Sequence, residues 1–199
     1  MRSSNSQMTA MMLEGSEASD SELAARAKGG DREAFGTLVE RHYAFVHRVA
    51  YRWCGRKADA EDIAQEVCAR LGRAIRGYRD SGAFTTWLYA ITLNAARDHA
   101  RKCARETAKT AAFGVHAQIV GAQIVGEATG DAEDPVEALW TAVRQLPDKQ
   151  REAVTLVYGE GVSHAVAADA MGISETTVSW HIHEAKKRLK VLMHQAGEV

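Results

Sequence analysis

The chain has 199 residues, enough for one or two domains, of which 46% are hydrophobic and 26% charged. This composition supports a packed core and excludes an intrinsically disordered chain. The formal net charge is only −1, but residues 21–106 carry an excess of Lys and Arg, which fits a polyanionic partner. No run of 18 apolar residues occurs, so we expect no membrane-spanning helix. The N-terminus also lacks the continuous apolar segment of a secretory signal.

Ala, Arg, Glu and Leu dominate the composition, and β-branched runs are scarce, which favours an all-α protein. The three cysteines, Cys54, Cys68 and Cys103, are an odd number without the spacing of a disulfide framework. We therefore expect free thiols and a cytoplasmic location, where thiols stay reduced.

The first part of the chain predicts an extension followed by two helices. Residues 1–20 are rich in Ser, Met and Glu without periodicity, and we expect a disordered extension there. A short helix is predicted over residues 21–28, ended by Gly29-Gly30. Asp31 is then placed to cap a longer helix that ends near Gly55. The apolar stripe of this helix consists of Phe35, Leu38, Val39, His42, Val46, Val49 and Trp53.

Residues 59–102 predict two more amphipathic helices, joined by a short loop over residues 79–82. The first, with Asp59 as N-cap, has its apolar stripe at Ile63, Val67, Leu71, Ile75 and Tyr78. The second is expected to bury Phe84, Trp87, Leu88, Ile91 and Ala95, and to expose Tyr89, Asn94, Arg97, Arg101 and Lys102. Such an exposed face suits a nucleic acid, although an ordinary solvated helix face has the same pattern. The four helices together predict one bundle over residues 21–106.

Residues 107–134 differ in character from the bundle. They contain repeated glycines and a doubled pentapeptide, Ala-Gln-Ile-Val-Gly. Because the stretch is long for a connection inside a compact domain, we interpret it as a flexible interdomain linker.

A second domain is predicted over residues 135–192, with a tail over 193–199. Asp134-Pro135 opens it as N-cap and first helical residue. Its first helix has Val136, Leu139, Trp140, Val143 and Leu146 on one face, and Pro147 starts a second helix that runs to Tyr158. Ala168, Gly172 and Val178 then have the offsets of a helix-turn-helix motif. The alternative is a plain helical hairpin.

The last predicted helix would be capped by Ser174 and would present polar side chains to DNA. If it enters a major groove, its N-terminal residues touch base edges and its later Lys and Arg residues meet phosphate. The residues expected to face outward are Glu175, Thr176, Ser179, Trp180, His181 and Lys186.

Two blocks of sequence resemble a known family. The block from Asp59 to Arg101 is similar to the second conserved region of RNA polymerase sigma factors, and Leu146 to Leu189 resembles their fourth region. The resemblance rests on Trp87-Leu88-Tyr89, on Leu146-Pro147 followed by Lys149-Gln150-Arg151-Glu152, and on Gly172-Ile173-Ser174. The order of the two blocks, without a third domain between them, resembles the extracytoplasmic-function (ECF) group.

The resemblance implies three binding surfaces. Core polymerase, through the coiled coil of its largest subunit, would bind Asp62, Gln65 and Glu66, with Arg70 and Arg73 further along the helix. The −10 promoter element, including a flipped base, would be bound by Arg79, Ser81, Phe84, Thr86, Tyr89, Asn94, Arg97 and Arg101. The −35 element would be read by Ser174, Glu175, Thr176, Ser179, His181 and Lys186. The polymerase flap and an anti-sigma factor are the other implied partners.

One departure from the family concerns the last helix. Ser179, His181 and Glu184 stand where the family usually has basic residues, so we expect a weaker phosphate attraction and do not transfer the family's −35 sequence.

Three functional hypotheses stay open at this point: a sigma factor of the ECF group, a stand-alone helix-turn-helix regulator that binds duplex DNA without polymerase, and a protein that only titrates an anti-sigma factor. We find no catalytic constellation and expect no enzyme and no cofactor. His99 and Cys103 lie four residues apart on one helix but lack further ligands, so we predict no metal site.

Overall fold

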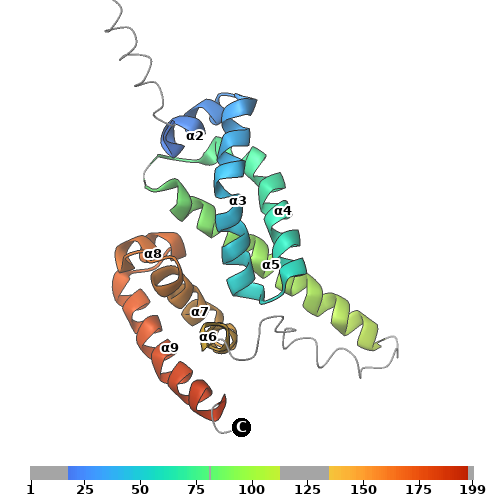
Figure 1. The fold of residues 1–199 in the computed structure, drawn as a ribbon, viewed down its shortest axis with the longest axis vertical. Coiled ribbons are helices and arrows are strands. Elements are labelled where there is room, and N and C mark those ends of the chain that lie inside the picture. Colours follow the sequence, from blue (N-terminus) through green and yellow to red (C-terminus); the bar gives the residue numbers. More distant parts are fainter. Residues whose placement is uncertain (1–17, 81, 113–134, 197–199) are drawn as a thin grey trace, which may run out of the picture.

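The structure is a computed structural model that describes residues 18–80, 82–112 and 135–196 (Figure 1). Within these ranges the chain consists of helices, turns and loops without a β-strand, which confirms the all-α prediction. None of the helices described there is both long and apolar enough to cross a membrane. The predicted N-terminal extension, except for its last residues, and the repeat of the linker lie outside the described residues.

The chain enters the bundle through two capped helices. Helix α2 (Asp20–Lys28) begins at Ser19, whose hydroxyl accepts from the Glu22 N–H while the Glu22 carboxylate accepts from the Ser19 N–H at 2.8 Å. Helical structure therefore starts within the segment expected to be disordered. Helix α3 (Arg32–Cys54) is capped by Asp31, as expected, which accepts from the Glu33 and Ala34 N–H groups.

The prediction that Asp59 caps the next helix is wrong. Helix α3 ends at Gly55, whose φ of 75° gives a left-handed cap, and helix α4 (Lys57–Ala74) begins after Arg56. Because only two residues separate the helices, Asp59 already lies in the first turn of α4 and contacts Arg56 at 3.7 Å. A single 3-10 turn, η1 (Ile75–Gly77), follows α4.

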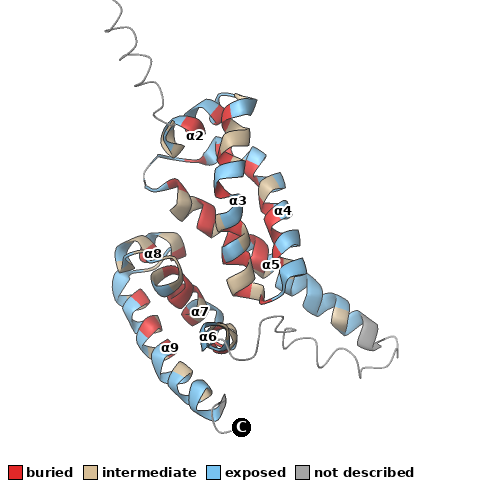
Figure 2. Cartoon of the chain, viewed as in Figure 1, coloured by how far each residue is buried: buried red, intermediate tan, exposed pale blue. Residues whose placement is uncertain are grey.

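Helix α5 (Phe84–Ala112) completes the bundle and continues beyond it. The predicted linker start at 107 therefore falls inside a helix. Residues 101–106 of α5 are exposed along its projecting half (Figure 2). The stripes predicted for α3 and α4 are confirmed in their central positions. The Leu, Ile and Val side chains below 3% exposure in the bundle are Leu38, Val46, Val49, Ile63, Val67, Leu71, Leu88 and Leu93.

The second part of the chain consists of short helices and one long one. They are α6 (Pro135–Arg144), α7 (Asp148–Val154), the π-helical turn η2 (Thr155–Gly159), α8 (His164–Met171) and α9 (Glu175–Ala196). Helix α9 therefore includes most of the predicted tail. Val143, Leu146, Val154 and Ala185 form a small core of this part, with Trp140 and Leu189 packed against it.

Two residues of the predicted apolar face of α6 do not reach this core. Val136 is 59% exposed and Leu139 is 41% exposed. Only the later turns of α6, at Trp140 and Val143, pack on the small core. The side chains of Val136 and Leu139, near the start of α6, therefore remain partly in solvent.

The two parts of the molecule pack against each other. Helix α5 contacts α8, and α3 contacts α6. The apolar core of the bundle is continuous with Ala153, Leu156, Ala168 and Met171 of the second part. The free chain therefore has a closed arrangement in its described residues, a point that the sequence left open.

We expect the substitution Leu38→Ala to lower the free energy of unfolding by about 2–5 kcal/mol, because it leaves a cavity in the core of the bundle. Leu38 is 0% exposed, whereas the matched control Leu139→Ala removes a side chain that is 41% exposed. Urea unfolding followed by circular dichroism measures both. Equal destabilisation by the two substitutions would contradict this account of the core.

Candidate functional site

An acidic strip lies along the solvent side of α4. Asp62, Gln65 and Glu66 are exposed, while Ile63 and Val67, on the same two turns, are buried in the bundle. This places the three residues predicted to bind polymerase on one open face, at positions one turn apart.

Arg70, which the family resemblance adds to this surface, is already paired within the chain. Its guanidinium contacts Glu66 at 2.6 Å and Asp98 of α5 at 3.1 Å. The hydrogen bond that Arg70 donates to Glu66, followed by the one that it donates to Asp98, raises the pKa of Arg70 above its usual value. Arg70 therefore joins α4 to α5 at the edge of the strip, and Arg73, one turn on, is exposed.

The loop between η1 and α5 is held at several points. Lys28 of α2 donates to the Tyr78 carbonyl at 2.9 Å, and the Ser21 hydroxyl donates to Asp80. The Tyr78 hydroxyl donates to the Gly82 carbonyl at 3.2 Å. These contacts position the exposed Arg79. Ser81, the other loop residue predicted to bind the −10 element, lies outside the described residues.

Phe84 is buried and therefore does not offer a surface for stacking on a base in this structure. It is 4% exposed, with ring centroids 5.1 Å from His42, 5.4 Å from Tyr78 and 5.4 Å from Trp87. Trp87, expected in the core, is only half-buried beside it. The aromatic group anchors the end of the loop to the bundle.

The face of α5 that was expected to be exposed is divided in two. Asn94 is exposed and Arg101 keeps 74% of its side chain in solvent, whereas Thr86 is half-buried. Tyr89 is 1% exposed, so the prediction that it faces solvent is wrong. Its hydroxyl points to the Glu152 carbonyl of α7 at 3.5 Å. Arg97 is also turned to α7, where it forms an ion pair with the Glu152 carboxylate.

The helix-turn-helix geometry is confirmed. Helix α8 ends at Gly172 with a φ of 65°, which permits the tight turn, and Val178 of α9 is 0% exposed. Ser174 caps α9, accepting from the Thr177 N–H at 3.2 Å. The motif therefore holds the first turns of α9 at the surface, where Glu175, Thr176 and Ser179 are exposed.

Two further residues of α9 are positioned by neighbours. His181 is half-buried, and burial, aided by the nearby Lys149, lowers its pKa, which favours the neutral ring. The Nδ1 atom of His164 in α8 lies 2.9 Å from the Ser179 hydroxyl oxygen, and this contact orients the Ser179 side chain. Lys186 is exposed, with its ammonium 5.2 Å from the centre of the Tyr158 ring.

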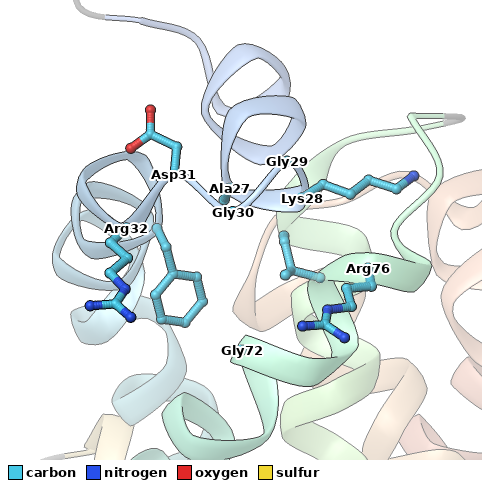
Figure 3. Close-up of a pocket in the computed structure, with 10 residues that line it drawn as sticks. Ala27, Lys28, Gly29, Gly30, Asp31, Arg32, Gly72 and Arg76 are labelled. Carbon is cyan, nitrogen blue, oxygen red and sulfur yellow. The ribbon is translucent and has the colours of Figure 1, made fainter.

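A hollow of about 480 Å³ lies between the α2–α3 turn and the end of α4 (Figure 3). Phe35 and Ile75 line it together with Arg32 and Arg76, which extend from opposite sides. None of the buried unpaired polar atoms found in the described residues belongs to its lining. The hollow therefore has a cationic rim but no feature that identifies a ligand.

Two family models match the chain over much of its length. The Sigma-70 region 2 family matches residues 38–106, and the Sigma-70, region 4 family matches residues 136–189. The first range covers most of the bundle with the acidic strip and the loop, and the second covers the helix-turn-helix part.

Two sigma factors are similar to most of the chain. The chain is 32% identical over 177 residues to the ECF RNA polymerase sigma factor SigM of Mycobacterium tuberculosis, covering 89% of this chain and 86% of SigM. It is 32% identical to the RNA polymerase sigma-H factor of Pseudomonas aeruginosa, over 89% of this chain and 97% of that protein. The chain therefore belongs to the ECF family of RNA polymerase sigma factors.

Solved structures agree with this assignment. The structure of CnrH in complex with the cytosolic domain of CnrY is similar at a TM-score of 0.62 and 25% identity, over 87% of this chain and 96% of that one. The sigma factor RpoE, solved with the anti-sigma factor NepR from Bartonella quintana, shares the fold at a TM-score of 0.63, 20% identity and coverage of 80% and 96%. A stand-alone helix-turn-helix regulator, the alternative function, is not favoured by these relatives.

Sequence reasoning missed the charged cluster between the two parts of the molecule. Glu152 of α7 is 2% exposed and Glu160 keeps only 7% of its side chain in solvent, and both pair with arginines of the bundle. In the sequence, the one indication of this cluster is Glu152, an acidic residue beside Ala153 and Val154, which are expected to face inward on a short helix. Helical periodicity alone does not say which arginine meets it.

The cysteines differ in their access to reagents. Burial raises the pKa of all three thiols, but Cys103 is exposed whereas Cys54 and Cys68 are half-buried. Because the thiolate is the reactive form, a raised pKa lowers reactivity at neutral pH.

We expect iodoacetamide at pH 7.5 to modify Cys103 first, and Cys54 and Cys68 more slowly, with their rates rising towards pH 9.5. Mass spectrometry of digested samples measures each rate, and fast modification of Cys54 at pH 7.5 would contradict this order.

Proposed function

We propose that this sigma factor binds core RNA polymerase through the α4 strip of Asp62, Gln65 and Glu66, and binds promoter DNA through α5 and α9. The observation that carries the proposal is the presence of two separate open polar surfaces on one chain. One is the acidic strip on α4 and the other is the exposed N-terminal half of α9. A duplex-DNA regulator has no use for an acidic strip facing away from its helix-turn-helix motif.

The polymerase contact is proposed to be mainly electrostatic. Asp62 and Glu66 are exposed carboxylates, and Glu61 adds a third on the same helix. A basic helical surface on the coiled coil of the largest subunit would complement this strip. Arg70 and Arg73 lie at the end of the strip and contribute hydrogen-bond donors to the same contact. The flap of the polymerase is the proposed partner of the second part of the chain.

The −10 element is proposed to lie along the η1–α5 loop and the open side of α5. Arg79 and Ser81 of the loop, with Thr86 and Asn94, would meet the unpaired strand, and Arg101 would meet upstream phosphates. Phe84 would act from the core by fixing the loop, since its ring is packed against His42 and Tyr78. Tyr89 and Arg97 join this surface once α7 no longer covers them.

The −35 element is proposed to be read by the first turns of α9. Glu175, Thr176 and Ser179 project from the capped end of the helix and can reach base edges in a major groove. Ser174 holds the start of the helix, His181 borders the contact, and Lys186 would meet phosphate. Linking the two DNA contacts in one chain raises the effective concentration of the second once the first has formed.

An anti-sigma factor is the proposed regulator. The similar structures of CnrH and of RpoE were each solved with a regulatory partner, CnrY and the anti-sigma factor NepR respectively. We propose that a protein of this kind covers the same surfaces here. The proposed partners place the chain in the cytoplasm, and its role is that of an initiation subunit without catalytic chemistry of its own.

Charge reversal at Asp62 tests the polymerase contact. We expect Asp62→Lys to weaken binding to core polymerase by about tenfold or more, because like charges placed across an interface repel. The matched control is Glu40→Lys, the same change at an exposed residue of α3. Fluorescence anisotropy of labelled protein titrated with core polymerase measures both. Unchanged binding by Asp62→Lys, or equal losses in both variants, would contradict the proposed surface.

Shortening Thr176 tests the −35 contact. We expect Thr176→Ala to relax base preference at one position of the −35 element, by about 1–3 kcal/mol if the contact to that base pair is direct. Holoenzyme rebuilt with each variant would be used to select promoters from a randomised pool, followed by sequencing. Lys190→Ala, an exposed residue near the far end of α9, is the control and should leave the base preference unchanged. Identical preferences for wild type and Thr176→Ala would remove Thr176 from the reading surface.

A further inference from the structure

A large apolar ring, that of Trp180, lies on the exposed side of α9. Trp180 is 56% exposed, and its ring contacts His181 edge-on, with 5.0 Å between the ring centres. Indole rings supply a large apolar surface at low cost in conformational entropy, and they are enriched at binding interfaces. A tryptophan left in solvent at this place in a helix-turn-helix motif therefore needs a functional account.

Trp180 lies on the side of α9 that is turned away from the core. Val178, Ile182 and Ala185 are buried and define the inner side of the helix. With 3.6 residues per turn, Trp180 projects nearly opposite to them. It shares its face with Thr176, one turn earlier, which is also exposed. Helix α9 runs along the outer edge of the second part (Figure 1). The ring therefore belongs to the same open face as a residue proposed to read the −35 element.

The first turns of α9 carry little positive charge. Glu175 is the only Asp, Glu, Lys or Arg between Ser174 and His183. Glu184, the next charged residue, is paired with Lys187 at 3.0 Å. Because phosphates attract cations, this end of the helix gains little from the DNA backbone. Its affinity for a promoter must therefore come mainly from contacts with base edges.

One group in the major groove complements the carbon face of an indole ring. Base pairs present hydrogen-bond donors and acceptors there, and thymine alone adds an apolar group, its C5 methyl. Covering donors or acceptors with an apolar ring leaves them unpaired, which costs free energy. Packing of the ring on the methyl group removes apolar surface of both partners from water. Thymine is therefore the base that suits this side chain.

We propose that Trp180 is a specificity-determining residue that recognises a thymine of the −35 element by packing its ring on the C5 methyl group. Helix α9 rises 1.5 Å per residue, so Trp180 lies about 6 Å beyond Thr176 along the axis, or about two base-pair steps. The thymine is expected at about that spacing from the base pair that Thr176 contacts. The inference rests on the proposed −35 role of α9 and adds to it a base that the helix selects.

The test measures binding of holoenzyme, rebuilt from core polymerase and the full chain, to a promoter mapped with the wild-type protein. Each thymine of the −35 element, on either strand, is replaced in turn by deoxyuridine, which lacks only the C5 methyl group. We expect one replacement to weaken binding by about fourfold, the effect of one buried methyl group. With Trp180→Ala the same replacement should have no effect, because the methyl group no longer has a partner.

Val191→Ala is the matched control for the loss of an exposed apolar side chain. Val191 is also 56% exposed and lies on the same side of α9, about three turns further on. It should leave the effect of deoxyuridine unchanged. Trp180→Phe, which keeps an apolar ring, should retain sensitivity to the replacement. Because Trp180 lies outside the core, circular dichroism should show the same thermal unfolding for Trp180→Ala as for wild type.

The dependence on salt distinguishes an apolar contact from a phosphate contact. We expect the slope of log affinity against log salt concentration to be the same for Trp180→Ala as for wild type, because no counterion is released by a methyl contact. Lys186→Gln, which removes a proposed phosphate contact, should make the slope shallower by about 0.9. A shallower slope in Trp180→Ala would contradict the apolar contact.

Three results would overturn the inference: a wild-type complex in which no thymine is sensitive, equal sensitivity in wild type and Trp180→Ala, or a mapped −35 element without thymine on either strand. Each would leave the proposed function intact, because initiation at the mapped promoter would already have been observed. Failure of the wild-type holoenzyme to initiate transcription would contradict the proposed function itself, and this inference with it.

Discussion

The burial of two carboxylates between the bundle and the helix-turn-helix part is the constraint on which the closed structure depends. Glu152 and Glu160 are removed from water, so each must be met by positive charge. The bundle supplies it from α3 and α5, where Arg52 lies over the Trp140 ring and Arg97 over the Trp53 ring. The relative placement of the two parts follows from this matching of charges. It also depends on the continuous apolar core, to which Leu156 and Met171 of the second part belong.

The same arrangement explains why the functional surfaces differ in access. Helix α4 is the side of the bundle turned away from α7 and α8, so its acidic strip stays in solvent (Figure 1). Helix α9 lies on the outer side of its own part, with its first turns held by Ser174. Helix α5, by contrast, is contacted by α8 of the second part. In this arrangement the proposed polymerase surface on α4 is open, whereas Tyr89 and Arg97 of the proposed −10 surface are covered.

Much of the local structure could be predicted from the sequence because it is set by neighbouring residues. The cap at Asp31, the left-handed turn at Gly172 and the cap at Ser174 each depend on a few adjacent positions, and all three are confirmed. The stripe of α4 is confirmed because helical periodicity reports the side that faces a partner. The error at Asp59 arose because a carboxylate in a first turn resembles an N-cap, whereas Gly55 had already ended α3.

The orientation of Tyr89 and Arg97 could not be predicted in the same way. Both contact α7, Tyr89 through the Glu152 carbonyl and Arg97 through the Glu152 carboxylate. This side of α5 becomes an interface only because α7, more than 50 residues later in the sequence, brings Glu152 to Arg97. Only the three-dimensional structure therefore shows which of the predicted binding residues are exposed and which are covered. The exposed Asn94 and Arg101 belong to the first group, and Tyr89 and Arg97 to the second.

The central claim is that this chain directs RNA polymerase to promoters, and run-off transcription tests it most directly. The purified chain would be added to bacterial core polymerase with fragmented genomic DNA, and the 5′ ends of the transcripts would be mapped. The account predicts discrete start sites that share −10 and −35 elements and that are absent without the chain. Transcripts whose starts do not depend on the added chain, or no transcripts despite active core polymerase, would contradict it.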